Sequence, residues 1–154
     1  MKKSNNTKLI IYATVTVIIA LAIFILSAQE ADDSSVLSDT TYETIISLWG
    51  NYMSDSLKWL LDEYIRKAAH LLIYTLLGSF MYLTVIEWKQ SELTLRLMAE
   101  YSLMATIAYA ISDELHQKFV AGRSCEWRDV CIDGVGAAIG ISIILIAKHS
   151  RRLK

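Results

Sequence analysis

The sequence predicts an all-α, multi-pass membrane protein with four transmembrane helices. Of its 154 residues, 54% are hydrophobic, and residues 9–26 form a run without a single charged side chain. About 20 apolar residues are needed for a helix to cross the hydrocarbon of a bilayer. The chain has no proline, so none of its apolar runs carries a proline break or kink. We therefore expect a single membrane domain over residues 1–154.

Residues 9–26 are predicted to be the first crossing. Lys2, Lys3 and Lys8 precede this run, as basic residues precede the apolar region of a signal peptide. That region spans only about 7–15 residues in signal peptides, and a cleavage pattern of small residues follows it. Because this run is longer and no A-x-A pattern follows, we expect an uncleaved transmembrane helix.

Residues 27–65 form a polar and acidic segment that we place outside the membrane. Within it, apolar residues from Tyr42 to Met53 and again from Leu57 to Tyr64 recur at steps of three and four. This spacing is typical of short amphipathic helices that lie on a membrane surface. Tryptophan favours the headgroup layer, so the segment is expected to lie at the membrane interface.

Three further crossings are predicted, at about residues 68–86, 97–111 and 130–147. The third is the weakest of the four because Glu100 lies in its first turn. Four crossings place both termini on one side, together with nine of the 15 Lys and Arg residues and only three acids. Cytoplasmic loops carry the excess of Lys and Arg. We therefore expect both termini in the cytoplasm and residues 27–65 outside the cell.

Ionisable side chains gather at the outer ends of these crossings. A charge at the centre of a bilayer costs about 2.5–3.5 kcal/mol on insertion scales, so such groups should face one another and not lipid. Arg66, His70 and Tyr74 share one helix face at i, i+4 and i+8. Asp133 precedes Gly136 and Gly140, whose spacing lets helices approach closely. We expect an outward-facing polar pocket, in which Asp133 contacts headgroup water or pairs with one of the cations Arg123, Arg66 and Lys67.

The chemistry of this pocket has several interpretations. The cations could bind a lipid-linked phosphate, because the guanidinium fork matches phosphate oxygens, or they could only neutralise nearby acids. No cofactor is predicted. A divalent metal on Asp129, Asp133 and His116 is chemically reasonable, and so is acid–base catalysis by His70, Glu114 or His116, but no catalytic motif is present. No basic patch with interleaved aromatics suggests nucleic-acid binding. Cys125 and Cys131 are either small packing residues or a disulfide.

Three stretches of the chain also resemble the VanZ-like family. They are Arg66-Lys67-Ala68-Ala69-His70 with Tyr74 and Gly78, Asp113-Glu114-x-His116-Gln117-x-Phe119-Val120-x-Gly122-Arg123, and Asp129-Val130-x-Ile132-Asp133-x-x-Gly136-x-x-x-Gly140. The family's short Ser-x-Gln element is matched by Ser27 and Gln29. The chain departs from the family at Ala121, where members often have proline, and in its long acidic segment after Ala31.

The resemblance implies a polytopic protein of the bacterial cytoplasmic membrane. Members of the family are associated with lowered susceptibility to glycopeptide antibiotics, especially teicoplanin and its lipid-tailed relatives. The expected partners are membrane lipid, a lipid-linked cell-wall precursor or a lipoglycopeptide. Whether the protein is an enzyme stays open, the alternative being phosphoryl or glycosyl chemistry on a lipid-linked cell-wall intermediate. The candidate binding residues are Ser27, Gln29, Arg66, Lys67, His70, Tyr74, Asp113, Glu114, Gln117, Arg123, Asp129 and Asp133.

Overall fold

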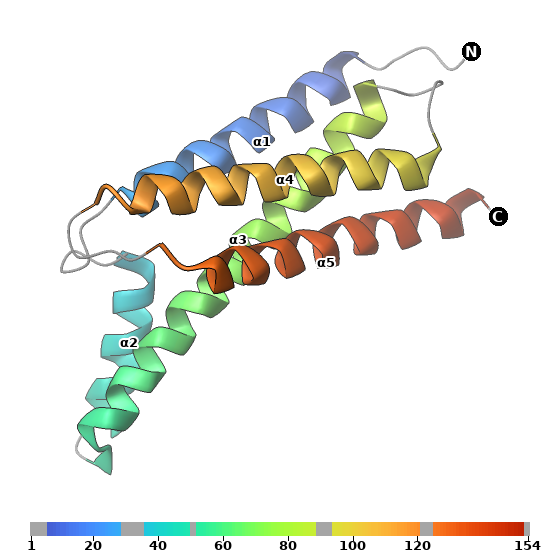
Figure 1. Cartoon of the computed structure of the whole chain (residues 1–154). Coiled ribbons are helices and arrows are strands. Elements are labelled where there is room, and N and C mark those ends of the chain that lie inside the picture. Colours follow the sequence, from blue (N-terminus) through green and yellow to red (C-terminus); the bar gives the residue numbers. More distant parts are fainter. Residues whose placement is uncertain (1–5, 29–35, 50–51, 89–93, 121–124, 153–154) are drawn as a thin grey trace.

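The computed structural model describes residues 6–28, 36–49, 52–88, 94–120 and 125–152. These residues form five α-helices and no β-strand, which confirms the predicted all-α class (Figure 1). The helices are α1 (Asn6–Ser27), α2 (Val36–Trp49), α3 (Asp55–Trp88), α4 (Leu95–Gln117) and α5 (Trp127–Arg152).

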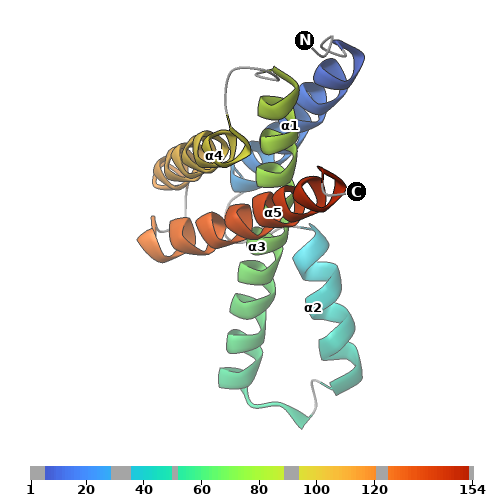
Figure 2. The same ribbon diagram turned by 90° about the vertical axis from the view of Figure 1, so that its right-hand side faces the viewer.

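The helices α1, α4 and α5 lie beside one another, and the second half of α3 crosses them (Figure 1). The first half of α3 and the helix α2 project sideways from this bundle as a hairpin, as both views show (Figures 1 and 2). The start of α1, the end of α3, the start of α4 and the end of α5 gather at one end of the bundle. The helix α3 packs against all four others, so it is the central element of the fold.

The helix α3 is longer than the sequence suggested. We expected the second crossing to start near residues 66–68, preceded by a separate amphipathic helix, but one helix of 34 residues begins at Asp55. No glycine occurs between Asn51 and Leu77 to end a helix there. At 1.5 Å per residue, α3 is about 50 Å long, well beyond the roughly 30 Å of bilayer hydrocarbon. Of the two expected amphipathic segments, only α2 is a separate helix.

Three helical stretches are long and apolar enough to cross a membrane, at residues 6–27, 56–88 and 127–150. The helix α4 is not one of them, although it was predicted as a crossing. Its first turns contain Arg96 and Glu100, and its last turns contain Asp113 and Glu114. These charges leave only a short apolar stretch between them.

The outside of the bundle carries large apolar side chains, and its interior holds polar side chains beside two apolar clusters. Large apolar residues on the outside of α5 are exposed at every third or fourth position, among them Val135, Ile139, Ile143 and Ile146. The buried face of α4 is instead small and polar, with Ser102 and Thr106 fully buried. Their hydroxyls donate to backbone carbonyls four residues earlier, at 2.7 and 2.9 Å, so they need no partner elsewhere. An apolar exterior around a polar interior is what a bilayer stabilises.

Glycines bring α3 and α5 into backbone contact. A Cβ atom added to Gly136 or Gly140 would overlap the carbonyl oxygen of Leu71 or Thr75, and one on Gly78 would lie 2.7 Å from the Cα of Ala137. Only a residue without a side chain fits at these three positions. The predicted role of Gly136 and Gly140 in close helix packing is confirmed, and this contact brings the start of α5 against the middle of α3.

Candidate functional site

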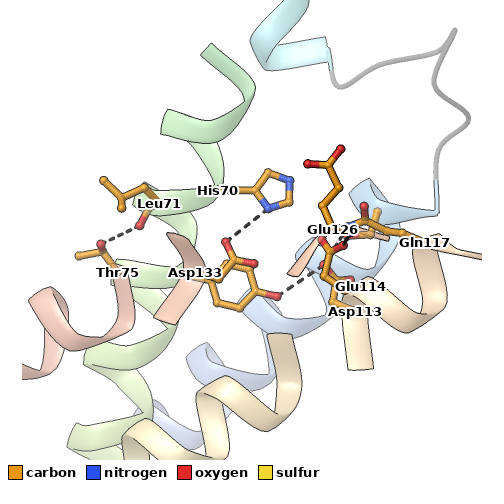
Figure 3. A network of polar contacts seen from close by, with 10 residues as sticks. His70, Leu71, Thr75, Asp113, Glu114, Gln117, Glu126 and Asp133 are labelled. Atoms are coloured by element: carbon orange, nitrogen blue, oxygen red, sulfur yellow. Dashed lines mark hydrogen bonds and ion pairs between the residues drawn. The ribbon is translucent and has the colours of Figure 1, made fainter. Parts of the chain in front are cut away.

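Polar side chains from four helices converge at the end of the bundle away from the chain termini. Each helix reaches this end by a different part: α1 by its last turn, α3 by its middle, α4 by its last two turns and α5 by its first two (Figure 3). The converging side chains are Ser27, His70, Tyr74, Asp113, Glu114, Gln117 and Asp133, which we call the polar cluster. All of them except His70 are at least 97% buried.

Asp113 is held by hydroxyl and amide donors. Its Oδ2 atom accepts hydrogen bonds from Ser27 Oγ at 2.9 Å, from Gln117 Nε2 at 3.2 Å and from the Tyr74 hydroxyl at 3.5 Å. Three neutral donors partly replace the water that this carboxylate loses on burial. The contact from Ser27 also ties the end of α1 to the end of α4.

Asp133 faces His70 across the interface of α3 and α5. Its Oδ1 atom lies 3.5 Å from His70 Nδ1, and its side chain is completely buried (Figure 3). The His70 ring is 22% exposed and stacks on Tyr74, with the ring centroids 6.5 Å apart. The second ring nitrogen of His70 points away from Asp133 (Figure 3). The carboxylate therefore faces one nitrogen of a partly exposed imidazole, without a hydrogen bond between the two groups.

Glu114 contacts the first turn of α5. Its Oε2 atom accepts a hydrogen bond from the backbone N–H of Glu126 at 2.9 Å. A carboxylate at a helix N-terminus satisfies an unpaired N–H and complements the helix dipole. Burial nevertheless raises the pKa of the Glu114 carboxyl, and the backbone hydrogen bond opposes that increase only in part.

A shallow depression opens beside the polar cluster. Its walls are Arg66, Lys67 and His70 of α3 and Asp129 and Ile132 of α5. Three of these residues can carry positive charge, and one carries negative charge. The depression is therefore a surface on which a small group with separated charges or dipoles could bind, directly above the pair of His70 and Asp133.

Several predicted residues have partners that the sequence did not indicate. Lys67 pairs with Glu63 one turn earlier on α3. Among the described residues Asp133 faces His70, and a pair of Asp133 with Arg123 stays a prediction. His116 stacks on Phe24 of α1, with ring centroids 4.4 Å apart. Two predicted site residues lie outside the described residues, Arg123 and Gln29. Cys125 and Cys131 are free, so the disulfide interpretation is wrong, and both are exposed, so neither packs inside the bundle.

The polar cluster contains more acceptor atoms than the described residues satisfy. Buried acceptors without a hydrogen bond there are Asp113 Oδ1, Glu114 Oε1 and both oxygens of Asp133, and Asp129 Oδ1 beside the cluster is another. Buried acceptors normally have donors, so these atoms mark places where water or a ligand group fits. Within the same described ranges, no three His, Cys, Asp or Glu side chains are arranged to hold a metal ion.

Some residues that shape this region were not singled out in the sequence. The Tyr109 hydroxyl donates to the carbonyl of Ala20 at 2.6 Å, and the Thr16 and Thr84 hydroxyls lie 3.1 Å apart. A tyrosine hydroxyl inside an apolar run needs a partner, so Tyr109 could have been recognised as a contact between helices. Ile132 belongs to the third stretch that resembles the VanZ-like family, but only the geometry shows that it lines the depression.

Comparison with known families decides the classification. The sequence profile of the VanZ/LLP1 family matches residues 9–148, nearly the whole chain. The chain belongs to the VanZ/LLP1 family. This match includes α2, α3 and α4, most of α1 and α5, and every residue of the polar cluster, so the convergence described above lies within the VanZ/LLP1 region. Comparisons with curated proteins and with solved structures gave no match.

Proposed function

We propose that this VanZ/LLP1 protein lowers the susceptibility of a bacterium to glycopeptide antibiotics, teicoplanin and its lipid-tailed relatives especially. It would do so by engaging a lipid-anchored component of the cell envelope, or the lipid-tailed drug, at the polar cluster. The observation that carries this proposal is the convergence of four helices on buried Asp133 and partly exposed His70, beside a shallow depression, in a bundle with an apolar exterior.

The proposal includes four crossings, with both termini in the cytoplasm and the polar cluster outside. The fourth crossing is α4, whose inner face is small and polar while Met104, Ile111 and Leu115 are exposed. The start of α1, the end of α3, the start of α4 and the end of α5 gather at one end of the bundle, as an even number of crossings requires (Figure 1). Most Lys and Arg residues belong to that end, which supports its placement in the cytoplasm.

An antibiotic susceptibility test can decide this proposal. The full chain is expressed in a teicoplanin-susceptible Gram-positive bacterium, beside the variants Arg66→Gln and Arg123→Ala and the control Arg96→Gln. Arg96 lies at the opposite end of the bundle and pairs only with Glu100 among the contacts found for it. We expect a several-fold higher inhibitory concentration of teicoplanin with the wild type and with Arg96→Gln, and a loss of that gain with the other two. Equal susceptibility with and without the wild-type chain would reject the proposal.

A second candidate function is enzymatic, and the geometry of His70 favours it. A buried carboxylate that holds one nitrogen of an accessible imidazole is the arrangement of a general base. The substrate would be a lipid-linked cell-wall intermediate, with phosphoryl or glycosyl chemistry at its headgroup. Purified protein should then convert such a substrate, and His70→Ala should abolish turnover while substrate still binds. If wild-type protein binds the intermediate without forming product, the enzymatic candidate is wrong and the binding function remains.

A further inference from the structure

The depression has a specific pattern of donors and acceptors. Arg66 and Lys67 provide N–H donors at its rim, and His70 provides a ring nitrogen that is not turned toward Asp133. Guanidinium groups suit the oxygens of a phosphate, and the Lys67 ammonium, which pairs with Glu63, has further N–H donors to offer one. A bare phosphate would, however, also meet the carboxylate of Asp129, which lines the same depression.

Asp129 therefore restricts the ligand. Its Oδ1 atom is buried and has no hydrogen bond among the described residues. An unsatisfied buried acceptor costs about 1–3 kcal/mol, so a ligand that brings a donor to it gains binding energy. A phosphate diester has no hydrogen-bond donor of its own. The donor to Asp129 must therefore belong to the alcohol group that is esterified to the phosphate. A hydroxyl or an ammonium beside the phosphate meets this requirement.

The surroundings of the depression point to a lipid as the source of this phosphate. On α3, Leu57, Leu60 and Tyr64 precede the depression and are 47%, 42% and 69% exposed. Leu72 and Leu76 follow it and are 64% and 52% exposed. Exposed apolar side chains thus flank Arg66 on both sides along one helix, the pattern of a helix that passes through the membrane interface. Lipid headgroups lie at that level.

We infer that the depression between α3 and α5 binds the headgroup of a phospholipid that carries a hydrogen-bond donor next to its phosphate, as phosphatidylglycerol and phosphatidylethanolamine do. Arg66, Lys67 and His70 contact the phosphate oxygens, and Asp129 accepts from the hydroxyl or ammonium. Ile132 forms the apolar wall against the rest of the headgroup. This inference rests on the outward placement in the proposed function and names the ligand class of the same site.

Native mass spectrometry of the purified full chain tests this inference with three added lipids of identical acyl chains. Phosphatidylglycerol and phosphatidylethanolamine carry a donor beside the phosphate, and phosphatidylcholine carries none. We expect the first two to be retained at least several-fold more than phosphatidylcholine. Arg66→Gln should lose retention of all three, and Asp129→Asn should lose only the preference over phosphatidylcholine. Arg66 is exposed, so its variant should remain folded, which thermal unfolding checks.

Three results would overturn the inference. They are equal retention of all three lipids by the wild type, unchanged retention by Arg66→Gln, and an equal loss with the control Arg96→Gln. Glycerol phosphate and phosphoethanolamine, added without lipid, separate a membrane source from a soluble one. If they bind as tightly as the lipids, the ligand is not a lipid. Because this assay uses purified protein, headgroup binding can succeed where the antibiotic susceptibility test fails, and the two proposals are judged separately.

Discussion

Asp133 of α5 and His70 of α3 form a pair at 3.5 Å in which the carboxylate is completely buried and the imidazole is partly exposed. This relationship joins the two helices with the tightest backbone contact, because Gly136 and Gly140 lie one and two turns beyond Asp133 on α5. The glycines fix the distance between the helices, and the pair fixes which residues face one another there.

Removal of His70 should be more damaging than neutralisation of Asp133. His70→Ala leaves a buried carboxylate without its partner, and such losses cost about 3–5 kcal/mol in fully buried pairs. Because the ring is 22% exposed, we expect about 3 kcal/mol, visible as a lower midpoint of thermal unfolding in detergent. Asp133→Asn should cost less, and the double variant His70→Ala/Asp133→Asn should be more stable than His70→Ala alone. Additive losses in the double variant would contradict a direct pair.

Gly140→Ala should destabilise the bundle, whereas Gly134→Ala should not. An added methyl at Gly140 overlaps the backbone of α3, and overpacking of this kind costs about 1–3 kcal/mol or more. At Gly134 the same methyl meets only Ile107 Cγ1 at 3.6 Å, an ordinary contact, and alanine gains about 0.5–1 kcal/mol of helix stability. The midpoints of thermal unfolding of the two variants measure the difference. A similar loss at both positions would show that α3 and α5 do not depend on this contact.

Ser27→Ala should weaken the attachment of α1. Its hydroxyl is the closest donor to buried Asp113, and an acceptor deprived of its donor costs about 1–3 kcal/mol. The matched control is Ser112→Ala, since Ser112 is exposed and donates only within α4, to the Tyr109 carbonyl at 2.7 Å. Limited proteolysis near the end of α1 should be faster in Ser27→Ala than in the wild type and unchanged in the control. Equal rates of proteolysis in all three proteins would show that contacts other than the Ser27 hydrogen bond hold α1 in place.

Glu114→Gln should stabilise the protein increasingly as the pH rises. Burial raises the pKa of Glu114 in the folded chain above that of the unfolded chain, so the folded state holds its proton longer and loses stability as pH rises between the two values. Asp129 and Asp113 raise the pKa of this carboxyl further, while His70 lowers it. The glutamine has no proton to lose. The midpoint of thermal unfolding of Glu114→Gln should exceed that of the wild type least near pH 4.5 and most at pH 8. A difference that does not change with pH would contradict the prediction.

The sequence predicted the class of the fold because an uncharged apolar run of membrane length is typical of a transmembrane helix and rare in water-soluble proteins. It also predicted that Gly136 and Gly140 lie in a helix contact, since their spacing places both on one face. The predicted length of α3 was wrong, because periodicity alone does not show whether two successive helical stretches form one helix. The helix α4, predicted as a crossing at residues 97–111, is not among the helices long and apolar enough to cross a membrane, because Arg96 and Glu100 lie in its first turns.

The membership of the polar cluster was predictable, but its pairs were not. Buried charge must meet other polar groups, so the gathering of Asp113 and Asp133 at one end followed from the cost of leaving either in lipid. Which cation faces Asp133 depends on the rotation of α3 about its axis and on the crossing angle with α5. Lys67 lies outside the helix face that His70 occupies, and its pair with Glu63 is local to α3. No pattern in the sequence shows whether His70 or Lys67 is the residue of α3 that faces Asp133.

The position of α3 as the helix that contacts all others has a consequence for biosynthesis. During translation, α3 enters the membrane before α4 and α5 exist, with the imidazole of His70 in place and its carboxylate partner still to be made. The nascent chain must hold this polar face against the insertion machinery, lipid headgroups or water until the last helix arrives. Completion of α5 is therefore the step that supplies Asp133 opposite His70, together with the two glycines that pack against the backbone of α3.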